Sequence, residues 1–331
     1  MFVGMVLAFC SVLVKVAQTK TTNIYMKNKL LSLASLLAVF NANAIEIGPT
    51  GSGVEMSGFV VFDYVNDDGS GPTPGVNDGD SAFMTSEVEV DFDFSSGPVS
   101  FALDIDVYKN GESGGNSYLE EAVATYAFND NLSVSAGKML SYLGFEAYDA
   151  PNMYQISSAY VTSYGYLYDG YADGISVDYA TDIFSVGIWT GLEEQSSFEY
   201  ALAYTGIENL TAKYIYADYG GSSESKQTIW ASYSLGSLLL AGELANHEDN
   251  AGTVGDDTDA YLIMGNYGFT DSLSLTLRFS STEDKGTTSA DIDKFTVSPT
   301  YMVTDSLALL AEYSDIEDQD EFFGVELIYT F

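Results

Sequence analysis

The feature that most constrains this chain is a strict alternation of apolar and ionic side chains, repeated in many short segments. Residues 87–94 read Glu-Val-Glu-Val-Asp-Phe-Asp-Phe, and residues 99–107 set Asp104 and Asp106 between apolar neighbours. Successive side chains of a strand point to opposite faces, so each segment is apolar on one face and ionic on the other. The pattern predicts strands, and no 3.6-residue periodicity follows the N-terminal region.

Sixteen such segments are predicted. Most have the 9–12 residues that a tilted strand needs to cross a bilayer, and they lie near 54–64, 83–94, 99–108, 118–128, 132–141, 173–181, 184–193, 198–206, 210–219, 227–235, 238–247, 258–269, 273–281, 293–302, 306–315 and 322–331. An even number returns both chain ends to one rim, as in single-chain bacterial barrels. Pro299 conflicts with its strand because proline has no N–H to donate, and a bulge or a later strand start would remove the conflict.

The links between these segments alternate in length. Tight links such as 95–98 and 129–131 are followed by longer polar ones such as 109–117 and 281–292. Short turns on one rim and long loops on the other are typical of transmembrane barrels, whereas a β-sandwich does not sort its loops in this way. We therefore predict an all-β fold, a transmembrane, antiparallel, up-and-down β-barrel of about sixteen strands.

The N-terminal region carries the features of an export signal. From Met26 the chain reads Met-Lys-Asn-Lys, then an apolar run over 30–40, then Ala-Asn-Ala at 42–44. A basic start, a short apolar core and an A-x-A site are typical of a secretory signal peptide. A second apolar run at 2–14 is too short to span a membrane. We interpret Met26 as the true start; a long signal with an extended basic region is the alternative.

From these features we predict two parts: residues 1–44 as an N-terminal extension with a cleaved signal peptide, and residues 45–331 as the outer-membrane barrel. No apolar stretch after residue 44 reaches 18 residues, so no transmembrane helix is predicted there. A membrane-spanning fold without helices must be a closed barrel, because only closure pairs every backbone polar group.

The charge is strongly negative, with a formal net charge of -37. Residues 1–44 hold four of the 11 basic residues and no acid, so 48 acids and seven bases remain in the barrel region. The 25 tyrosines suit a membrane–water interface, and a disordered acidic chain would lack them. Such acidity excludes a nucleic-acid partner, which requires basic surface.

The third long link, residues 142–172, spans 31 residues and holds eight tyrosines. A loop of this length is usually functional, and we favour its folding into the lumen as a constriction. An extra strand at 157–166 or a surface flap is the alternative, and the extra strand would spoil the even count. Its tyrosines either pack the loop against the wall or form a sliding track for sugars. The constriction candidates are Glu146, Asp149, Tyr154, Asp169 and Asp173.

Strand parity predicts which side chains line the lumen. With apolar residues facing lipid, the inward set contains Glu87, Glu89, Asp91, Asp93, Asp104, Asp106, Glu121, Asp178, Glu199, Glu243, Arg278, Glu312 and Glu326, and Lys213 is a further inward base. A charge on the lipid face would cost about 2–4 kcal/mol near the midplane. Carboxylates around a pore concentrate cations and repel anions. We expect a cation-preferring channel; the alternative is that the acids only solvate a wide lumen.

Neither a cofactor nor a specific metal site is predicted. Six acids crowd the second and third predicted strands and could bind divalent cations, but no segment matches an EF-hand loop, and acid-rich loops usually form a solvated surface. The single histidine, His247, ends a predicted strand and is expected to be exposed. Nucleophilic triads need a base beside the nucleophile, and no Walker loop or zinc cluster is present, so the chain is not expected to be an enzyme.

The C-terminal run Phe323-Gly-Val-Glu-Leu-Ile-Tyr-Thr-Phe331 ends in phenylalanine with aromatics at alternate positions. It resembles the signal that hands outer-membrane proteins to the barrel-assembly machinery. Sixteen strands and a long third loop resemble Gram-negative general porins. The run 136–146, Ala-Gly-Lys-Met-Leu-Ser-Tyr-Leu-Gly-Phe-Glu, with Asn152-Met-Tyr-Gln-Ile-Ser157, is similar to the OmpL-like β-barrel porins.

These resemblances imply a passive diffusion channel for small hydrophilic solutes in the bacterial outer membrane, surrounded by lipid and often a homotrimer. General porins set basic side chains against acidic ones at their narrowest point, and this sequence has no basic cluster. A structural or adhesive barrel with a plugged lumen is the alternative function.

Overall fold

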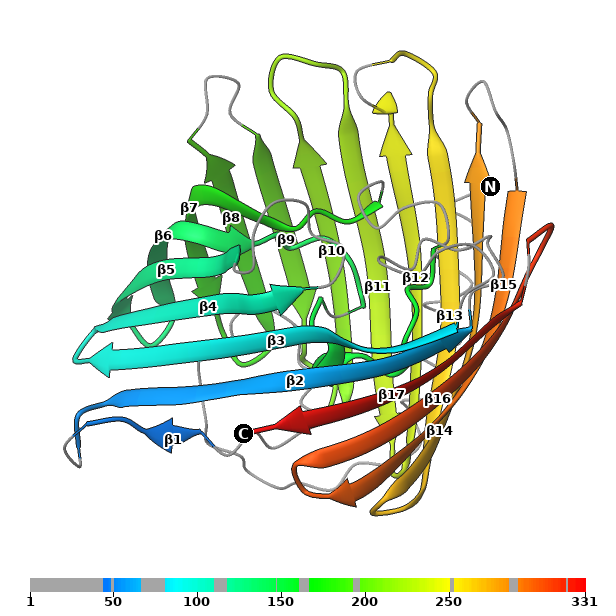
Figure 1. The fold of residues 1–331 in the computed structure, drawn as a ribbon. Coiled ribbons are helices and arrows are strands. Elements are labelled where there is room, and N and C mark those ends of the chain that lie inside the picture. The colour runs from blue at the N-terminus through cyan, green and yellow to red at the C-terminus, as the bar shows by residue number, and fades with distance from the viewer. Residues whose placement is uncertain are drawn as a thin grey trace.

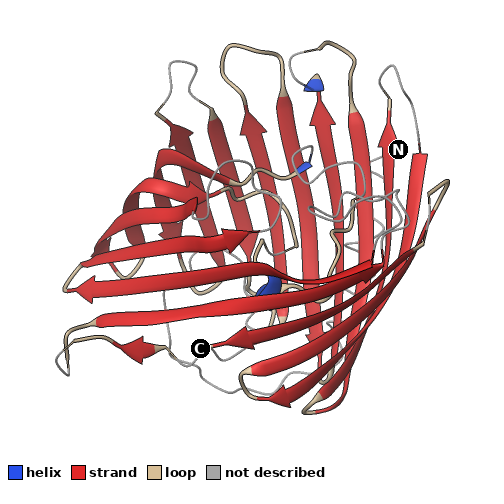
Figure 2. Cartoon of the chain, in the orientation of Figure 1, coloured by secondary structure: helices blue, strands red, loops and turns tan. Residues whose placement is uncertain are grey.

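The computed structural model describes residues 44–48, 51–66, 81–109, 118–146, 148–160, 167–192, 197–250, 253–285, 291–319 and 321–331. The described chain is almost entirely β-strand, with a short 3-10 helix, η1 (Ala150–Asn152), in the link after the fifth barrel strand (Figure 2). Within these residues no helix has the length and apolar character needed to cross a membrane. The predicted signal segment lies outside the described residues, except for Ala44.

Sixteen of the described strands form a closed antiparallel barrel (Figure 1). They are β2 (Val54–Asn66), β3 (Ser81–Ser96), β4 (Val99–Lys109), β5 (Tyr118–Asn129), β6 (Leu132–Leu140), β7 (Tyr171–Ala180), β8 (Phe184–Gly191), β9 (Phe198–Tyr204), β10 (Leu210–Asp218), β11 (Ser225–Leu235), β12 (Leu238–Glu248), β13 (Thr258–Thr270), β14 (Leu273–Asp284), β15 (Asp291–Thr304), β16 (Leu307–Ile316) and β17 (Phe322–Thr330). Each pairs with the next, and β17 pairs with β2. The predicted sixteen-strand barrel is thereby confirmed. A two-residue strand, β1 (Ile45–Glu46), adds to the edge of β2.

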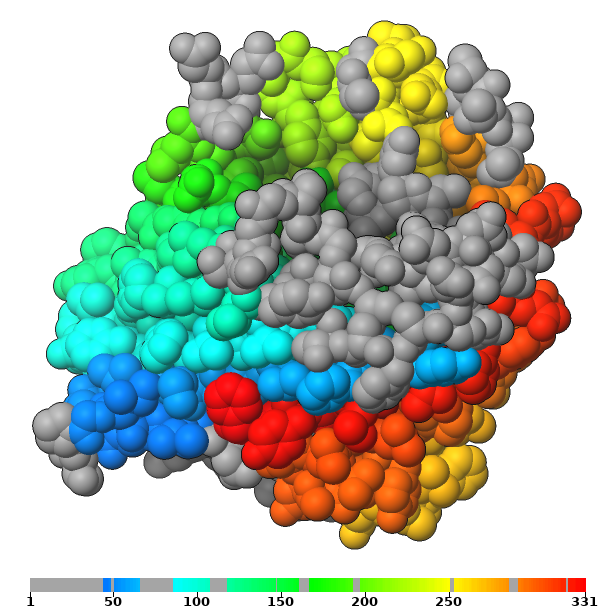
Figure 3. Space-filling view, viewed as in Figure 1, coloured from blue at the N-terminus to red at the C-terminus, as the bar shows by residue number. Residues whose placement is uncertain are grey.

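The last residue completes the seam of the barrel. Gly58 and Phe331 exchange two backbone hydrogen bonds of 3.1 and 3.0 Å. Gly58 has no side chain where a Cβ would lie 2.3 Å from the Glu89 carbonyl oxygen and 2.8 Å from the Phe331 ring. The first and last strands therefore approach closely, as the adjacent blue and red surfaces show (Figure 3).

Pro299 lies inside β15, opposite Leu275 of β14. On the other side, the ladder to β16 pairs Val297 with Tyr313 and Thr300 with Leu310, and no pair is formed at Pro299. The register is the same before and after this interruption. The missing N–H of proline is thus accommodated by a local gap in one ladder, and neither the bulge nor the later strand start that we considered is present there.

The strand connections alternate in length. The links β3–β4, β5–β6 and β11–β12 contain two residues each, whereas residues 141–170 join β6 to β7. In an up-and-down barrel, alternate links lie on the same rim. Gly97 and Gly236 each adopt a φ of 61° in two of the short turns, a left-handed conformation that glycine reaches without steric cost.

The two faces of the sheet differ as the alternation predicts. On β9 the exposed fraction is 52% for Leu202 but 2% for Ala201 and 5% for Glu199. Large apolar side chains are exposed in this way on strands all around the barrel. The outer face is therefore an apolar surface of the kind that a bilayer surrounds, and polar side chains face the lumen.

Candidate functional site: the barrel interior

The link 141–170, called the inner loop below, packs against inward-facing side chains of the barrel. Its residues Leu143, Phe145 and Tyr160 belong to one buried cluster with Ile215 and Leu262 of the wall. The cluster also contains Trp230, whose ring meets that of Phe145 edge-on at a centroid distance of 5.5 Å. Tyr154, a predicted constriction residue, is partly buried against the same cluster. Apolar packing thus holds the described part of the inner loop against β10–β13.

Two buried bases, Arg278 of β14 and Lys294 of β15, bind the same stretch of the inner loop. Arg278 forms an ion pair with Glu146 and donates to the carbonyl oxygens of Ser157 and Ser158 at 2.9 and 3.0 Å. Lys294 donates to the Ser157 Oγ at 2.6 Å and the Ser158 carbonyl oxygen at 2.9 Å. We call Arg278 and Lys294 the cationic latch.

Glu312 of β16 completes this attachment. Its carboxylate accepts hydrogen bonds from the backbone N–H groups of Ile156 and Ser157, at 2.7 and 2.9 Å, and from the Ser157 hydroxyl. Glu312 is 1% exposed. Hydrogen bonds from backbone N–H groups stabilise a buried carboxylate, so this predicted channel-lining acid binds the inner loop.

Both ends of the inner loop are also fixed by inward-facing acids or bases. Tyr142 donates its backbone N–H to Glu199 and its hydroxyl to Asp178, both at 2.7 Å. At the other end, Asp169 accepts from Lys226 Nζ at 2.6 Å and from the Tyr219 hydroxyl. Burial, followed by the charge of Asp178, raises the pKa of the Tyr142 phenol, so this phenol remains a hydrogen-bond donor.

Two loop tyrosines cover a further predicted lining residue. The hydroxyl groups of Tyr160 and Tyr168 both donate to Glu243 of β12, the former at 3.1 Å. Burial and the Glu243 charge raise the pKa of both phenols well above the usual value. Glu243 is 3% exposed, because these rings lie over it.

The acids of β3–β5 form a contrasting surface. We call Glu87, Glu89, Asp91, Asp93, Asp104, Asp106, Glu120 and Glu121 the acid wall. Glu89 lies directly opposite Asp106, and Asp91 opposite Asp104. Like charges directly opposite one another destabilise a sheet, so these carboxylates need water, protons or cations between them.

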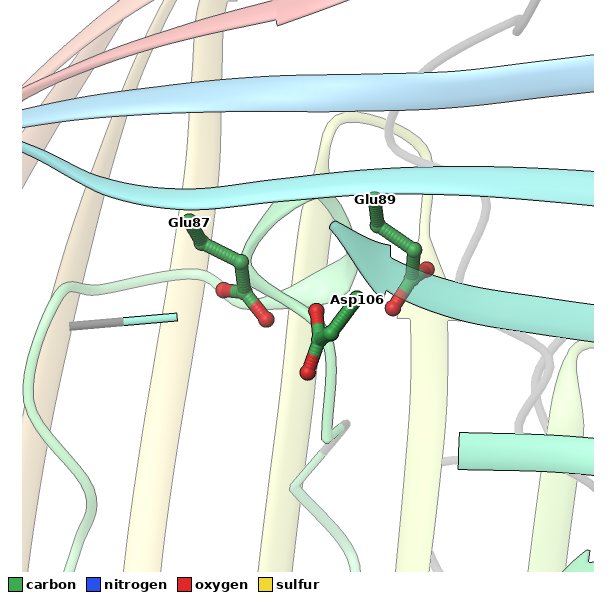
Figure 4. Close-up of side chains that lie close together, drawn as sticks. All are labelled: Glu87, Glu89 and Asp106. Carbon is green, nitrogen blue, oxygen red and sulfur yellow. The ribbon is translucent and has the colours of Figure 1, made fainter. Parts of the chain in front are cut away.

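Two sets of three carboxylates come especially close. Oxygens of Glu87, Glu89 and Asp106 lie within 4.8 Å of one another, and so do oxygens of Glu89, Glu120 and the inner-loop Asp149. Figure 4 shows the first set, with the three side chains directed toward one another. Glu89 belongs to both sets. The acid wall and the inner loop therefore meet at Asp149.

Glu120 was not identified from the sequence. Alternation places only one of Glu120 and Glu121 on the inner face, but a bulge in the β4–β5 ladder follows Asp104. A bulge sets two residues of one strand against one of its partner, and Glu120 is 2% exposed. Two consecutive acids within a strand were the available signal.

Two further predicted site residues, Glu326 and Asp173, and the single histidine, His247, lie on β17, β7 and β12. Glu326 lies opposite Asp63 across the seam. Asp173 does not lie in the inner loop, because β7 begins at Tyr171. It stands on β7 opposite Lys138, on the same face of the strand as the exposed Val177. His247 was expected to be exposed, but it is 1% exposed and its Nε2 lies 2.8 Å from Glu224.

Comparisons with known proteins agree with this architecture. The model of a family described as "Putative beta-barrel porin-2, OmpL-like" matches residues 76–327. No curated protein matches the chain by sequence. Among solved structures, OmpF of Salmonella typhi in complex with daunomycin has a TM-score of 0.66 at 15% identity, covering 87% of this chain and 100% of that one.

Two other outer-membrane proteins are similar in fold. The trimer form of in-vitro folded OmpT of Vibrio cholerae has a TM-score of 0.64 at 17% identity, covering 84% of this chain and 99% of that one. The outer-membrane channel DcaP of Acinetobacter baumannii has a TM-score of 0.62 at 12% identity, covering 85% and 99%. At these identities the likeness concerns the fold.

Proposed function

Because this chain belongs to the OmpL-like family of β-barrel porins, we propose that it forms a water-filled channel through the bacterial outer membrane. Small hydrophilic solutes pass through it by passive diffusion, and cations are preferred. The observation that carries this preference is the distribution of charge around the inner face.

Most bases of the described interior lie on a different part of the wall from the acids. The buried bases whose side chains the structure describes are Lys213, Lys226, Arg278 and Lys294, on β10, β11, β14 and β15, and the register also sets Lys109 of β4 opposite Glu87. Three of them, Lys226 and the two residues of the cationic latch, bind the inner loop. The acid wall stands on β3–β5 and meets the loop at a single described carboxylate, Asp149.

This separation favours cations for an electrostatic reason. Carboxylates on a low-dielectric wall attract cations and repel anions from the adjacent water. Arg278 and Lys226 are paired with the loop carboxylates Glu146 and Asp169, so these two bases contribute little opposing field. We further propose that the inner loop narrows the lumen, so that solutes pass between it and the acid wall.

The test is a reversal-potential measurement in planar bilayers under a KCl gradient. The potential is expected to have the sign of K⁺ preference and to shrink as total salt rises, because the Debye length falls from about 10 Å at 0.1 M to about 3 Å at 1 M. Equal permeability of K⁺ and Cl⁻, or a preference for Cl⁻, would contradict the proposal.

A plugged structural or adhesive barrel is the second candidate. The many contacts between the inner loop and the wall support it, because side chains from β9 to β16 are engaged. Single-channel recording separates the two functions: a plugged barrel gives no current, whereas a diffusion channel gives stepwise conductance.

We propose the same export and assembly route as for other outer-membrane barrels. A signal peptide ending at Ala44 is removed, the machinery that inserts barrels recognises the strand ending at Phe331, and three copies associate in the lipid. The trimer form of Vibrio cholerae OmpT supports the trimer. N-terminal sequencing of the exported protein tests cleavage, deletion of Phe331 tests assembly, and native mass analysis tests the oligomeric state.

A further inference from the structure

We propose that a cavity between the barrel wall and the ends of the inner loop binds a small organic cation of the quaternary ammonium class. The cavity has a volume of about 250 Å³. It lies where the inner loop leaves β6 and reaches β7, and inward-facing residues of β8, β9 and β10 complete its lining. A cavity of about 150 Å³ already holds benzene, and drug-sized ligands usually occupy about 300 Å³ or more. The volume therefore suits a small ligand.

The indole of Trp189, which lines this cavity, is held against the wall by a pair of glycines. Gly174 of β7 and Gly191 of β8 lie directly opposite each other. A Cβ on Gly174 would lie 2.2 Å from Trp189 Nε1, and one on Gly191 would lie 3.2 Å from Cη2 of the same ring. The indole thus extends across both glycines, and larger residues at these positions would displace it. The wall is built to present an aromatic ring to the cavity.

Two tyrosines, Tyr171 and Tyr219, also line the cavity. The hydroxyl group of Tyr219 donates to Asp169 of the inner loop, and Lys226 Nζ lies 5.4 Å from the centroid of the Tyr219 ring. A cation within about 6 Å of a ring centroid is attracted by the ring quadrupole. Clusters of aromatic side chains bind quaternary ammonium groups through this attraction, and three aromatic residues meet here.

The charge around the cavity has the sign that such a ligand requires. Of the described residues that line it, Asp169 and Glu199 are carboxylates and none is a base. Lys226 acts on both acids, but it forms its ion pair with Asp169, at 2.6 Å. Glu199 is 5% exposed and accepts hydrogen bonds from the Tyr142 backbone N–H, at 2.7 Å, and from the Ser141 side chain. These donors are neutral, so they leave the negative charge of Glu199 in excess.

The combination of rings and charge selects the class of ligand. A neutral sugar can stack on aromatic rings, but it gains nothing from an excess negative charge. A metal ion gains from the charge, but it needs several oxygen ligands, and much of this lining is aromatic or apolar. A quaternary ammonium group uses both features, because its methyl groups pack on the rings and its charge lies close to the carboxylate.

Binding can be measured without any channel activity. Choline chloride is titrated calorimetrically into detergent-solubilised protein in mildly alkaline buffer, and we expect one saturable site. Glu199→Gln should weaken binding at least tenfold, because the amide still accepts from the Tyr142 N–H but carries no charge. Trp189→Leu should weaken it severalfold through loss of the ring. Circular dichroism checks that both variants are folded.

Two controls separate this site from general attraction. Dimethylbutanol, the neutral isostere of choline in which carbon replaces nitrogen, should bind the unaltered protein at least tenfold more weakly, and this comparison decides even where a variant does not fold. Glu121→Gln removes a carboxylate of the acid wall from outside the described lining, so its affinity for choline should match that of the wild type. Equal affinity for dimethylbutanol, saturable binding of glucose instead of choline, equal weakening by Glu121→Gln, or no saturable binding of choline would each overturn the proposal.

The consequence for permeation rests on the proposed channel function. Because the cavity lies inside the barrel, choline is expected to lower the K⁺ conductance of the wild-type channel and to lose this effect in Glu199→Gln. K⁺ current without choline binding would overturn this inference and leave the channel standing. Choline binding without any current would overturn the channel function and leave the site.

Discussion

Arg278 and Glu146 form an ion pair across 132 positions of the sequence, and their side chains are 0% and 2% exposed. A buried ion pair contributes little relative to apolar residues of the same size, but loss of one partner leaves an uncompensated charge. The contact therefore fixes where the inner loop lies more than it adds to stability.

Replacing Arg278 by methionine is expected to destabilise the barrel by about 3–5 kcal/mol, because the Glu146 carboxylate stays buried without its base. The effect is measured as a lower temperature at which the folded band disappears on a semi-native gel. The double variant Arg278→Met/Glu146→Gln should recover most of the loss, and a double variant as unstable as the single one would contradict the explanation.

Gly58→Ala tests the seam between the first and last strands. A methyl group there would lie 2.3 Å from the Glu89 carbonyl oxygen and 2.8 Å from the Phe331 ring, so the strands must separate. Overpacking of this kind costs about 1–3 kcal/mol, which refolding yield and the same gel assay report. Gly265→Ala is the matched control, because its nearest neighbour is 3.6 Å away; equal effects of the two changes would refute the steric argument.

The strands could be predicted because lipid outside and water inside impose one rule on every residue. The face on which Leu202 or Glu199 lies follows from its place in the alternation alone. That rule located all sixteen barrel strands that the structure describes. Lys294 lies two residues before the inward-facing Thr296 on the same strand, so its inward position could have been predicted. Lys226 lay one residue outside the predicted strand and was missed.

The site could be predicted only in part, because its main contacts join distant segments. Parity placed Glu312 and Arg278 on the inner face, but it contains no information on which loop residues they bind. Glu120 departs from parity through a bulge, and the trace of that bulge in the sequence is a pair of consecutive acids, which does not say which of the two faces inward. The sequence thus identifies the lining charges, and the path of the inner loop decides which remain open to the lumen.

A rim loop offers a test of pH dependence outside the membrane. Asp249 accepts a hydrogen bond of 2.7 Å from the Gly255 backbone N–H, and this bond lowers the pKa of its carboxyl below the usual value. A depressed pKa stabilises the folded loop above the unfolded value of about 3.9, and the contribution is lost as pH falls through the folded pKa.

Protection of the Gly255 amide against hydrogen exchange should therefore persist at neutral pH and decline only in acid below the usual aspartate range. Asp249→Ala should remove this protection at neutral pH, while Asp256→Ala, a change of a nearby loop acid, should retain it. Protection that is insensitive to Asp249→Ala would show that the amide is shielded by other means.

The proposed cation preference depends on which acids remain open to the lumen. Asp91 and Asp104 are directly opposite on β3 and β4, whereas Glu243 is covered by the hydroxyl groups of Tyr160 and Tyr168. Asp91→Asn/Asp104→Asn should therefore reduce the ratio of K⁺ to Cl⁻ permeability severalfold at low salt, because two wall charges are removed within about a Debye length of the path. Glu243→Gln, which removes a carboxylate already occupied by two phenols, should leave the ratio nearly unchanged. Reversal potentials in the same KCl gradient measure both variants, and a larger loss in Glu243→Gln would place the conduction path on the other side of the inner loop.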